Sequence, residues 1–205
     1  MKFLEIKKYL EKLIVFTTND LKKIDDNFNK RKIFLWWKKF YFKQVRRWVY
    51  ILSDINLNEN ILFLIANKAY FPSYISLETA LSFYWIIPET VYEITSISSK
   101  KTFSFEFENI NFTYKTLSSK YFFWYDVINF WNRNFLIWEL EKVILDFLYF
   151  RKNITWIEDF EELRFNKIEL KNKLNFKKLQ EYAKIFNKKV LDKKINILID
   201  YINKW

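Results

Sequence analysis

Cysteine, histidine and glycine are absent from this sequence of 205 residues, and proline occurs only twice. Without cysteine, the chain can form neither a disulfide nor a cysteine zinc site, and it has no thiolate nucleophile. Without histidine, it lacks the commonest general base and metal ligand. Without glycine, it has no glycine-rich loop of the kind that holds a nucleotide phosphate. We therefore expect no metal site and no cofactor, and any catalysis would depend on carboxylates, lysine, tyrosine, serine or threonine.

The absence of glycine also restricts tight turns. A chain of this length would hold roughly 14 glycines at the average usage of about 7%. Backbone positions with positive φ must then be occupied by other residues, and asparagine and aspartate are the least strained of these. The chain is rich in asparagine, so we expect asparagine and aspartate at such positions.

Long apolar segments are absent as well. The longest apolar run covers residues 61–66, whereas a membrane-spanning helix needs about 20 apolar residues. The first twelve residues carry charges throughout, unlike the apolar centre of a signal peptide. We expect a cytoplasmic protein with no membrane-spanning segment.

Positive charge is abundant, and the formal net charge at pH 7 is +11. Residues 1–56 hold 14 Lys or Arg against 6 Asp or Glu, a net charge of +8, so most of the excess lies in the first quarter of the chain. Positive charge gathered in one region favours a polyanionic partner such as DNA or RNA.

Within this quarter, residues 28–52 combine eight cationic and nine aromatic side chains with no acidic one. The first half has the apolar spacing of a helix, and residues 41–45 and 48–52 are two short β-rich runs. A basic helix followed by a basic hairpin is typical of a winged helix-turn-helix. In that fold the helix enters the major groove and the hairpin, called the wing, lies along the phosphate backbone or a minor groove. The expected contacts to double-stranded DNA are Asn29, Lys30, Arg31, Lys32, Lys38, Lys39, Lys43, Arg46 and Arg47.

Two other interpretations of this segment remain. The cations of residues 28–52 could form an ordinary solvated face over a core. The aromatic side chains of residues 36–43 could stack on single-stranded bases, although in a winged helix such rings more often belong to the core. The position of the segment favours DNA binding, because two further helices precede it.

The remaining periodicity divides the chain into two domains. Residues 3–16 have one apolar stripe and predict the first helix. Thr17 or Thr18 caps a short second helix that runs to about residue 25, where a turn leads to the basic helix. Residues 54–60 are polar and turn-prone, so we expect a DNA-binding domain over 1–56 and a second domain over 57–205.

In the second domain the sequence predicts helices and strands in alternation, an α+β fold. Helices are expected at 59–70, after Ser76 and at 139–152, and strands at 91–97, 102–107, 110–114, 122–128 and 134–137. Glu108 and Asn109 form the expected hairpin turn. Further helices at about 156–163, 176–186 and 188–203 complete a mixed α/β domain with a small antiparallel sheet and C-terminal helices.

Two strings of this domain resemble a known family. Residues 72–96 read PSYISLETALSFYWIIPETVYEITS and residues 139–150 read ELEKVILDFLYF. Together they resemble the AbiEi family, the antitoxins of type IV toxin–antitoxin and abortive-infection operons, and RRWVY at 46–50 resembles the end of that family's wing. The resemblance covers about residues 17–165. The family's motif positions correspond here to Tyr74, Ser76, Glu78, Glu141, Lys142 and Asp146.

The resemblance implies a winged helix that represses its own promoter, and a second domain that counteracts a nucleotidyltransferase-like toxin. The wing-tip role would then belong to Arg46 and Arg47. An alternative is a protein-binding antitoxin or adaptor without sequence-specific DNA binding. An enzyme is the weakest of the three hypotheses, because nothing in the sequence resembles a nucleotide site.

The sequence departs from the family pattern where the pattern has glycine. Trp48, Trp85, Trp124 and Trp131 occupy four such positions. A large side chain at a turn position that needs positive φ costs about 1 kcal/mol or more. We therefore hypothesise that some of these tryptophans are UGA codons read as glycine in the source organism. Phe40 stands at another expected glycine position, which this hypothesis does not explain.

Two further groups of residues have ordinary explanations. The acidic residues Glu158, Asp159, Glu161 and Glu162 could bind a metal, but without histidine a solvated helix face is the better interpretation. Lys142 and Asp146 are four residues apart on a predicted helix, so we expect an ion pair rather than a catalytic carboxylate. The aromatic residues of 70–74 and 121–125 could form either a protein-binding face or half-buried core.

Overall fold

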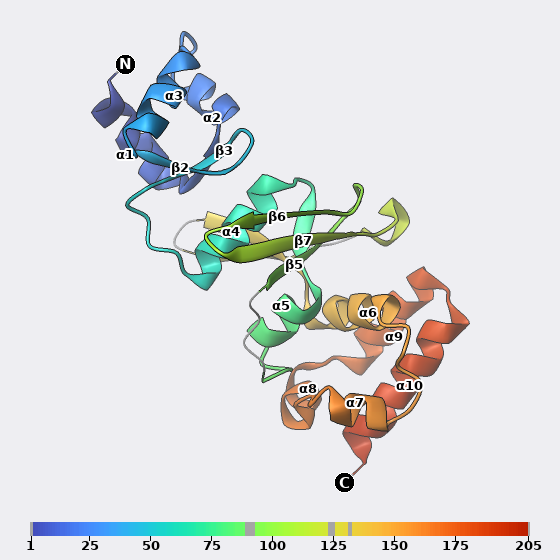
Figure 1. Cartoon of the computed structure of the whole chain (residues 1–205). Helices are drawn as coiled ribbons and strands as arrows, with labels where there is room; N and C mark the ends of the chain where they lie inside the picture. The colour runs from blue at the N-terminus through green and yellow to red at the C-terminus, as the bar shows by residue number, and fades with distance from the viewer. Residues whose placement is uncertain (1, 89–92, 123–125, 131–132, 205) are drawn as a thin grey trace.

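The computed structural model describes residues 2–88, 93–122, 126–130 and 133–204. The chain is α+β, as expected, and its strands form one sheet of three strands and one of six (Figure 1). None of the described helices is long and apolar enough to cross a membrane.

The first 52 residues form three helices and the three-stranded sheet. Their order is α1 (Phe3–Leu13), β1 (Val15–Thr17), α2 (Thr18–Ile24), α3 (Arg31–Lys38), β2 (Phe42–Arg46) and β3 (Val49–Leu52). The sheet is antiparallel with the strand order β1-β3-β2. The prediction of one helix over 3–16 was too long, because Val15–Thr17 pair with β3 instead. The predicted cap at Thr17 is confirmed, since its side chain accepts a hydrogen bond from the Asp20 amide.

This sheet is buried on both faces. Phe16, Phe42 and Tyr50 pack with α1 and α3 in one apolar cluster. The opposite face, formed by Val15, Val45, Val49 and Ile51, belongs to a second cluster that continues into the rest of the molecule. Helix α4 (Glu59–Ala69) contacts β1 and β2 on one side and β4 (Ser73–Ile75) on the other. The core therefore extends across the expected boundary at residue 56.

The six-stranded sheet has the order β6-β7-β5-β4-β9-β8. Its remaining elements are α5 (Leu77–Phe83), β5 (Glu93–Ser98), β6 (Phe103–Phe107), β7 (Ile110–Thr116), η1 (Ser119–Tyr121), β8 (Asp126–Phe130) and β9 (Arg133–Ile137). The expectation of an antiparallel sheet was wrong: β5 and β7 run parallel, and β4 and β9 run parallel. The sequence prediction missed β4, because three residues are too few to show an alternating pattern. Residues 91–92 and 123–125 of two expected strands lie outside the described residues.

The β6–β7 hairpin turns at Glu108 and Asn109, as predicted. Both residues have positive φ, 51° and 61°, which is the conformation of a type I′ turn. Of the other residues with positive φ in the described part of the chain, only Asn187 is an asparagine or aspartate. The expectation that these two residue types would take such positions was therefore wrong in most cases.

Five helices complete the chain: α6 (Leu140–Phe150), α7 (Glu158–Glu162), α8 (Lys167–Lys173), α9 (Phe176–Phe186) and α10 (Lys189–Asn203). The predicted C-terminal helices are confirmed, and α8 was not foreseen. Helix α6 is buried over most of its length, because α5, α9 and α10 all pack against it. Figure 1 shows these helices gathered at one end of the molecule, away from α1–α3.

Candidate nucleic-acid interface

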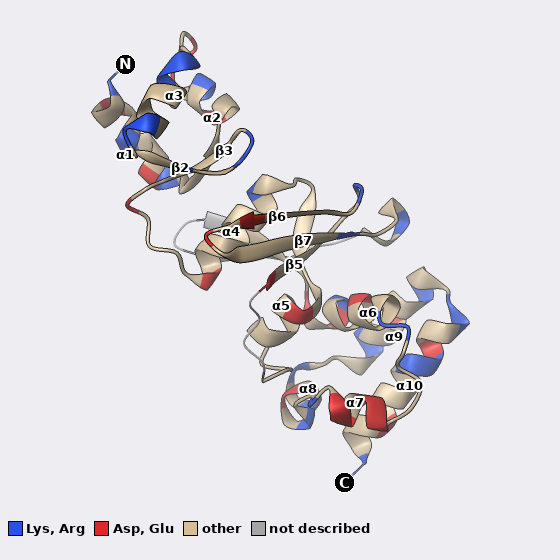
Figure 2. Cartoon of the chain, viewed as in Figure 1, with Lys and Arg blue, Asp and Glu red and all other residues tan. Residues whose placement is uncertain are grey.

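Helix α3 presents the cations that the sequence analysis selected for DNA contact. Ile33 and Trp36 are buried and fix the helix against α1 and the sheet. Asn29 accepts a hydrogen bond from the Arg31 amide at 2.9 Å, and this bond supports the first turn of the helix. The cationic residues of the helix and its ends are exposed or half-buried, namely Lys30, Arg31, Lys32, Lys38 and Lys39. Figure 2 shows the Lys and Arg segments of the ribbon in blue at both ends of α3.

The tip of the β2–β3 hairpin lies beside the start of α3. The Arg47 guanidinium lies 5.1 Å from the centre of the Trp48 ring, and the Lys30 ammonium lies 6.0 Å from the same ring. The start of the helix and the tip of the hairpin therefore each place one cation near the same exposed indole. A winged helix uses these two elements to contact DNA.

Arg46 and Lys43 point the other way, toward the second domain. The Arg46 guanidinium donates a hydrogen bond to the Ala69 carbonyl at 2.9 Å and lies 4.5 Å from the centre of the Phe103 ring. The Lys43 ammonium is 3.0 Å from a carboxylate oxygen of Glu108. The sequence analysis placed both cations among the DNA contacts, whereas the structure uses them to join the hairpin to α4 and to the β6–β7 hairpin.

The aromatic residues of 36–43 divide between the core and the surface. Trp36 and Phe42 are core residues, whereas Trp37, Phe40 and Tyr41 are exposed, Phe40 to 83%. The expectation that these rings belong to the core is therefore confirmed for only two of the five. The α3 surface is therefore cationic with apolar side chains between the charges.

Four of the six motif residues of the second domain meet in a buried polar cluster. The Asp146 carboxylate accepts hydrogen bonds from Tyr74 Oη at 2.9 Å and Ser76 Oγ at 3.1 Å. The Lys142 ammonium donates to Tyr74 Oη at 3.0 Å and pairs with Asp146 one helical turn away, which confirms the predicted ion pair. Burial raises the pKa of Asp146 and lowers the pKa of Lys142, because both charged forms are removed from water.

The other two motif residues also connect elements of the fold. Glu141 accepts a hydrogen bond from the Asn175 amide at 2.8 Å, just before α9. Glu78, in the first turn of α5, forms an ion pair with Arg151 at 2.7 Å. All six motif residues therefore hold β4, α5, α6 and α9 together, and the buried cluster offers no surface to a partner.

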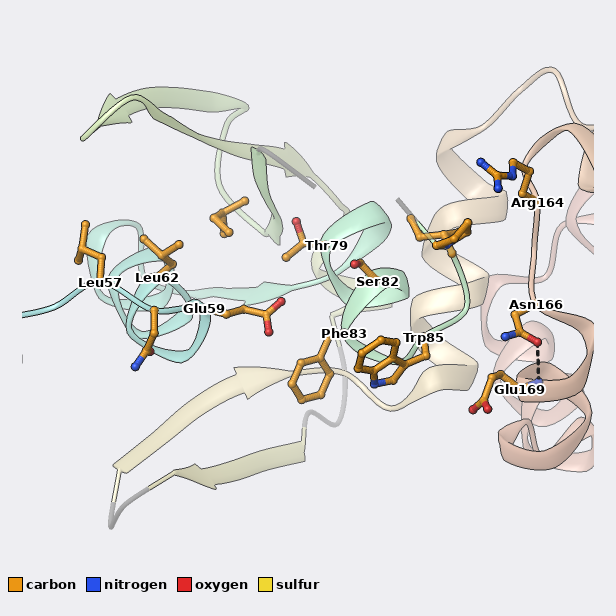
Figure 3. Close-up of a pocket in the computed structure, with 14 residues that line it drawn as sticks. Leu57, Glu59, Leu62, Thr79, Ser82, Phe83, Trp85, Arg164, Asn166 and Glu169 are labelled. Carbon is orange, nitrogen blue, oxygen red and sulfur yellow. Dashed lines mark hydrogen bonds between the residues drawn. The ribbon is translucent and has the colours of Figure 1, made fainter. Parts of the chain in front are cut away.

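A cavity of about 1160 Å³ lies between the starts of α4 and α8 and the end of α5, and Figure 3 shows the residues that line it. Leu57, Leu62 and Phe83 are among the apolar residues that line it. Two of its polar side chains serve the fold: Asn166 accepts a hydrogen bond from the Glu169 amide at the start of α8, and Thr79 donates to a carbonyl of β5. Glu59 also lines the cavity, and burial raises the pKa of its carboxyl.

The acidic residues of α7 do not form a metal centre. Asp159 accepts hydrogen bonds from the Thr155 and Trp156 amides at the start of the helix, and these bonds lower its pKa. Across the described part of the chain, no group of three or more acidic side chains is arranged to hold a metal ion. The aromatic residues near 70–74 and 121–125 that the structure describes also belong mainly to the core, since Tyr74 and Tyr121 are buried.

The sequence matches no model of a known protein family, and no curated protein has significant similarity to it.

Proposed function

We propose that residues 1–56 are a winged helix-turn-helix and that the protein binds double-stranded DNA at its own promoter as an autorepressor. The element order α1-β1-α2-α3-β2-β3 with the strand order β1-β3-β2 supports this proposal, because it provides two helices before a basic helix and a hairpin after it. The observation on which the proposal depends is the exposed cationic surface that α3 shares with Arg47 at the hairpin tip.

The set of DNA contacts in this proposal is narrower than the one chosen from the sequence. Asn29, Lys30, Arg31, Lys32, Lys38 and Lys39 remain in it with Arg47. Lys43 and Arg46 are left out, because their charged groups are engaged with Glu108, Ala69 and Phe103. In this proposal α3 enters the major groove, and Arg47 is the one residue of the wing that contacts the phosphate backbone of the DNA.

For the second domain we propose the antitoxin role, directed against a nucleotidyltransferase-like toxin and without enzymatic activity of its own. Its support is the resemblance of residues 72–96 and 139–150 to the AbiEi family. The buried cluster of Tyr74, Ser76, Lys142 and Asp146 would stabilise the fold of this domain. The toxin or its target would bind to another surface of the domain.

Binding to the promoter tests the DNA proposal. If Lys30, Arg31, Lys38, Lys39 and Arg47 each neutralise a phosphate, the logarithm of the binding constant should fall with the logarithm of salt concentration with a slope of roughly −4 to −5. Fluorescence anisotropy on promoter DNA and on a random duplex would measure this slope. A binding constant that does not change between low and moderate salt would exclude the proposed phosphate contacts.

The exposed apolar residues of α3 favour one alternative, a protein-binding adaptor. Phe34, Leu35 and Trp37 lie on the same surface as the cations, and such a combination also suits a protein partner. A full-length variant with Arg31, Lys38 and Arg47 changed to alanine separates the hypotheses. Loss of promoter repression with rescue from the toxin retained would support DNA binding as a separate function, whereas rescue lost together with repression would favour the adaptor.

A further inference from the structure

Two tryptophans adopt the left-handed backbone conformation that glycine tolerates best. φ is 69° at Trp48 and 64° at Trp85. The structure describes four other tryptophans, none of which has positive φ: Trp36, Trp37, Trp138 and Trp156. A residue with a Cβ atom is disfavoured in this conformation, because Cβ lies too close to the neighbouring carbonyl oxygen.

Trp48 is the second residue of a two-residue hairpin loop. Arg46 pairs with Val49 across the hairpin, so Arg47 and Trp48 alone make the turn. Among the loop residues only Trp48 has positive φ. A turn with positive φ at its second central residue is type II, which requires glycine or asparagine at that position.

Trp85 occupies the glycine position of a helix-ending motif. The Ile86 amide donates to the Leu81 carbonyl at 2.8 Å, and the Trp85 amide donates to the Ser82 carbonyl at 2.9 Å. These two bonds define the Schellman motif, in which the residue that follows the helix cap is usually glycine. The apolar pair that accompanies the motif is also present, since Leu81 and Ile86 are both fully buried.

Neither indole is buried in the core, where packing could offset the free-energy cost of this backbone conformation. Trp85 is 74% exposed and Trp48 is 48% exposed. Figure 3 shows the Trp85 side chain between Phe83 and the start of α8, at the edge of the cavity. The centre of the Trp48 ring lies 6.0 Å from the Lys30 ammonium and 5.1 Å from the Arg47 guanidinium, and both of these residues are exposed. Glycine would satisfy the backbone at both positions.

We propose that positions 48 and 85 are glycine in the protein as its source organism makes it. The codon at both positions would be UGA, which that organism reads as glycine and which the printed sequence renders as tryptophan. The complete absence of glycine from 205 residues agrees with this proposal. The proposal does not rest on the proposed function, and it holds whether or not the protein binds DNA.

The gene and the native protein test the proposal directly. UGA is expected at codons 48 and 85, and UGG at both would overturn the proposal. Trypsin cleavage after Arg47, Lys68 and Lys100 places the two positions in separate peptides, 48–68 and 69–100. Mass spectrometry of the protein isolated from its source should show each peptide lighter by one Trp-to-Gly exchange. Peptides with the mass of tryptophan would overturn the proposal.

Thermal unfolding of full-length recombinant variants tests whether glycine suits the backbone. Trp48→Gly and Trp85→Gly should each raise the midpoint of unfolding above that of the tryptophan form. Trp156→Gly is the matched control, since Trp156 is 71% exposed but has no positive φ, and it should give no such increase. Phe40, with φ of 55°, occupies the same position in a second Schellman motif, because its amide donates to the Trp37 carbonyl at 2.9 Å and the Tyr41 amide donates to the Trp36 carbonyl at 3.0 Å. Phe40→Gly should therefore raise the midpoint as the two tryptophan variants do. If Trp48→Gly and Trp85→Gly lower the midpoint as Trp156→Gly does, the proposal is wrong.

Discussion

The buried ion pair of Lys142 and Asp146 has no access to water, and both side chains are fully buried. A charge in such a position is tolerated only when its partner and its hydrogen bonds are complete. Tyr74 and Ser76 supply these bonds to Asp146. The cluster lies where β4, α5 and α6 meet, so its loss should affect the whole second domain.

We predict that Asp146→Ala destabilises the protein by about 3–5 kcal/mol, because it leaves the Lys142 charge buried without a partner. Glu169→Ala is the matched control, since Glu169 and Lys173 form an exposed pair with the same spacing. That change should cost less than about 1 kcal/mol. Urea unfolding of both variants measures the difference, and equal losses would contradict a special role for the buried pair.

Asp20 joins α2 to the second domain and gives stability a pH dependence. Burial alone would raise the pKa of Asp20. The ion pair with Lys68 at 3.0 Å and the hydrogen bonds from Thr17 lower the pKa by more than burial raises it, so the pKa in the folded protein lies below the ordinary 3.8. A carboxyl with a lowered folded pKa stabilises the protein fully above its unfolded pKa and loses this contribution as the pH falls through the folded value.

Replacement of Asp20 by asparagine should therefore remove a stabilising contribution that depends on pH. At neutral pH the wild-type protein should be more stable than the Asp20→Asn variant, and this difference in stability should shrink as the pH falls below about 4. Thermal unfolding of both proteins from pH 7 to pH 3 measures this difference. A difference that stays constant or grows toward acid pH would show that the Asp20 charge has no such effect.

At the scale of the elements, the cations of the hairpin β2–β3 have two different surroundings, the solvent and the second domain. Arg47 is exposed at the tip, whereas the neighbouring Arg46 is turned toward Ala69 and Phe103. Arg46 is the last residue of β2, whereas Arg47 is the first of the two turn residues, so two arginines that look equivalent in the sequence have different surroundings. Arg46 acts in the proposed function as a positioning residue that holds the hairpin against the second domain.

The salt dependence of promoter binding should distinguish the two arginines. Arg47→Ala should reduce the magnitude of the log–log salt slope by about 1, because one phosphate contact is lost. Arg46→Ala should leave the slope unchanged and instead lower the thermal midpoint, because it removes the bond to Ala69 and the packing on Phe103. If Arg46→Ala reduces the slope as Arg47→Ala does, Arg46 contacts DNA after all.

Element prediction from the sequence succeeded where periodicity was strong. The apolar stripe of α1, the Thr17 cap and the Glu108–Asn109 turn all have local signals, and each was placed correctly to within a few residues. The strands β1 and β4 were missed, since each has three residues and depends on a distant partner strand. The parallel pairing within the six-stranded sheet is likewise a long-range property that no local pattern contains.

The candidate site shows the same division between local and distant information. Charge and spacing were sufficient to predict that Lys30, Arg31 and Lys38 are exposed. They could not show that Arg46 is engaged within the fold, because its hydrogen-bond acceptor lies 23 residues further along the chain. The sequence showed the strings that contain the motif residues. It could not show that four of them are buried in one cluster, because this requires β4 and α6, about 70 residues apart in the sequence, to pack together.

At the scale of the whole molecule, the two expected domains share one apolar core. Val15, Val45, Val49 and Ile51 of the first sheet belong to the same cluster as Ile61 and Ile65 of α4. The Arg46, Lys43 and Asp20 interactions surround this contact. A fragment that ends at residue 56 would expose an apolar sheet face to water, so the first 56 residues and the second domain are connected through their packing.

We therefore predict that the full chain unfolds in a single cooperative transition, whereas separate domains would give two. A fragment of residues 1–56 should be less stable than the same residues within the full chain, since it loses the burial of Val15, Val45, Val49 and Ile51. Burying one such side chain contributes roughly 1.5–3 kcal/mol, which is a large share of the stability of so small a domain. Calorimetry of the full chain, with circular dichroism of the fragment, measures both quantities. Two separate calorimetric transitions, one of which matches an independently folded 1–56 fragment, would show that the shared core does not couple the domains.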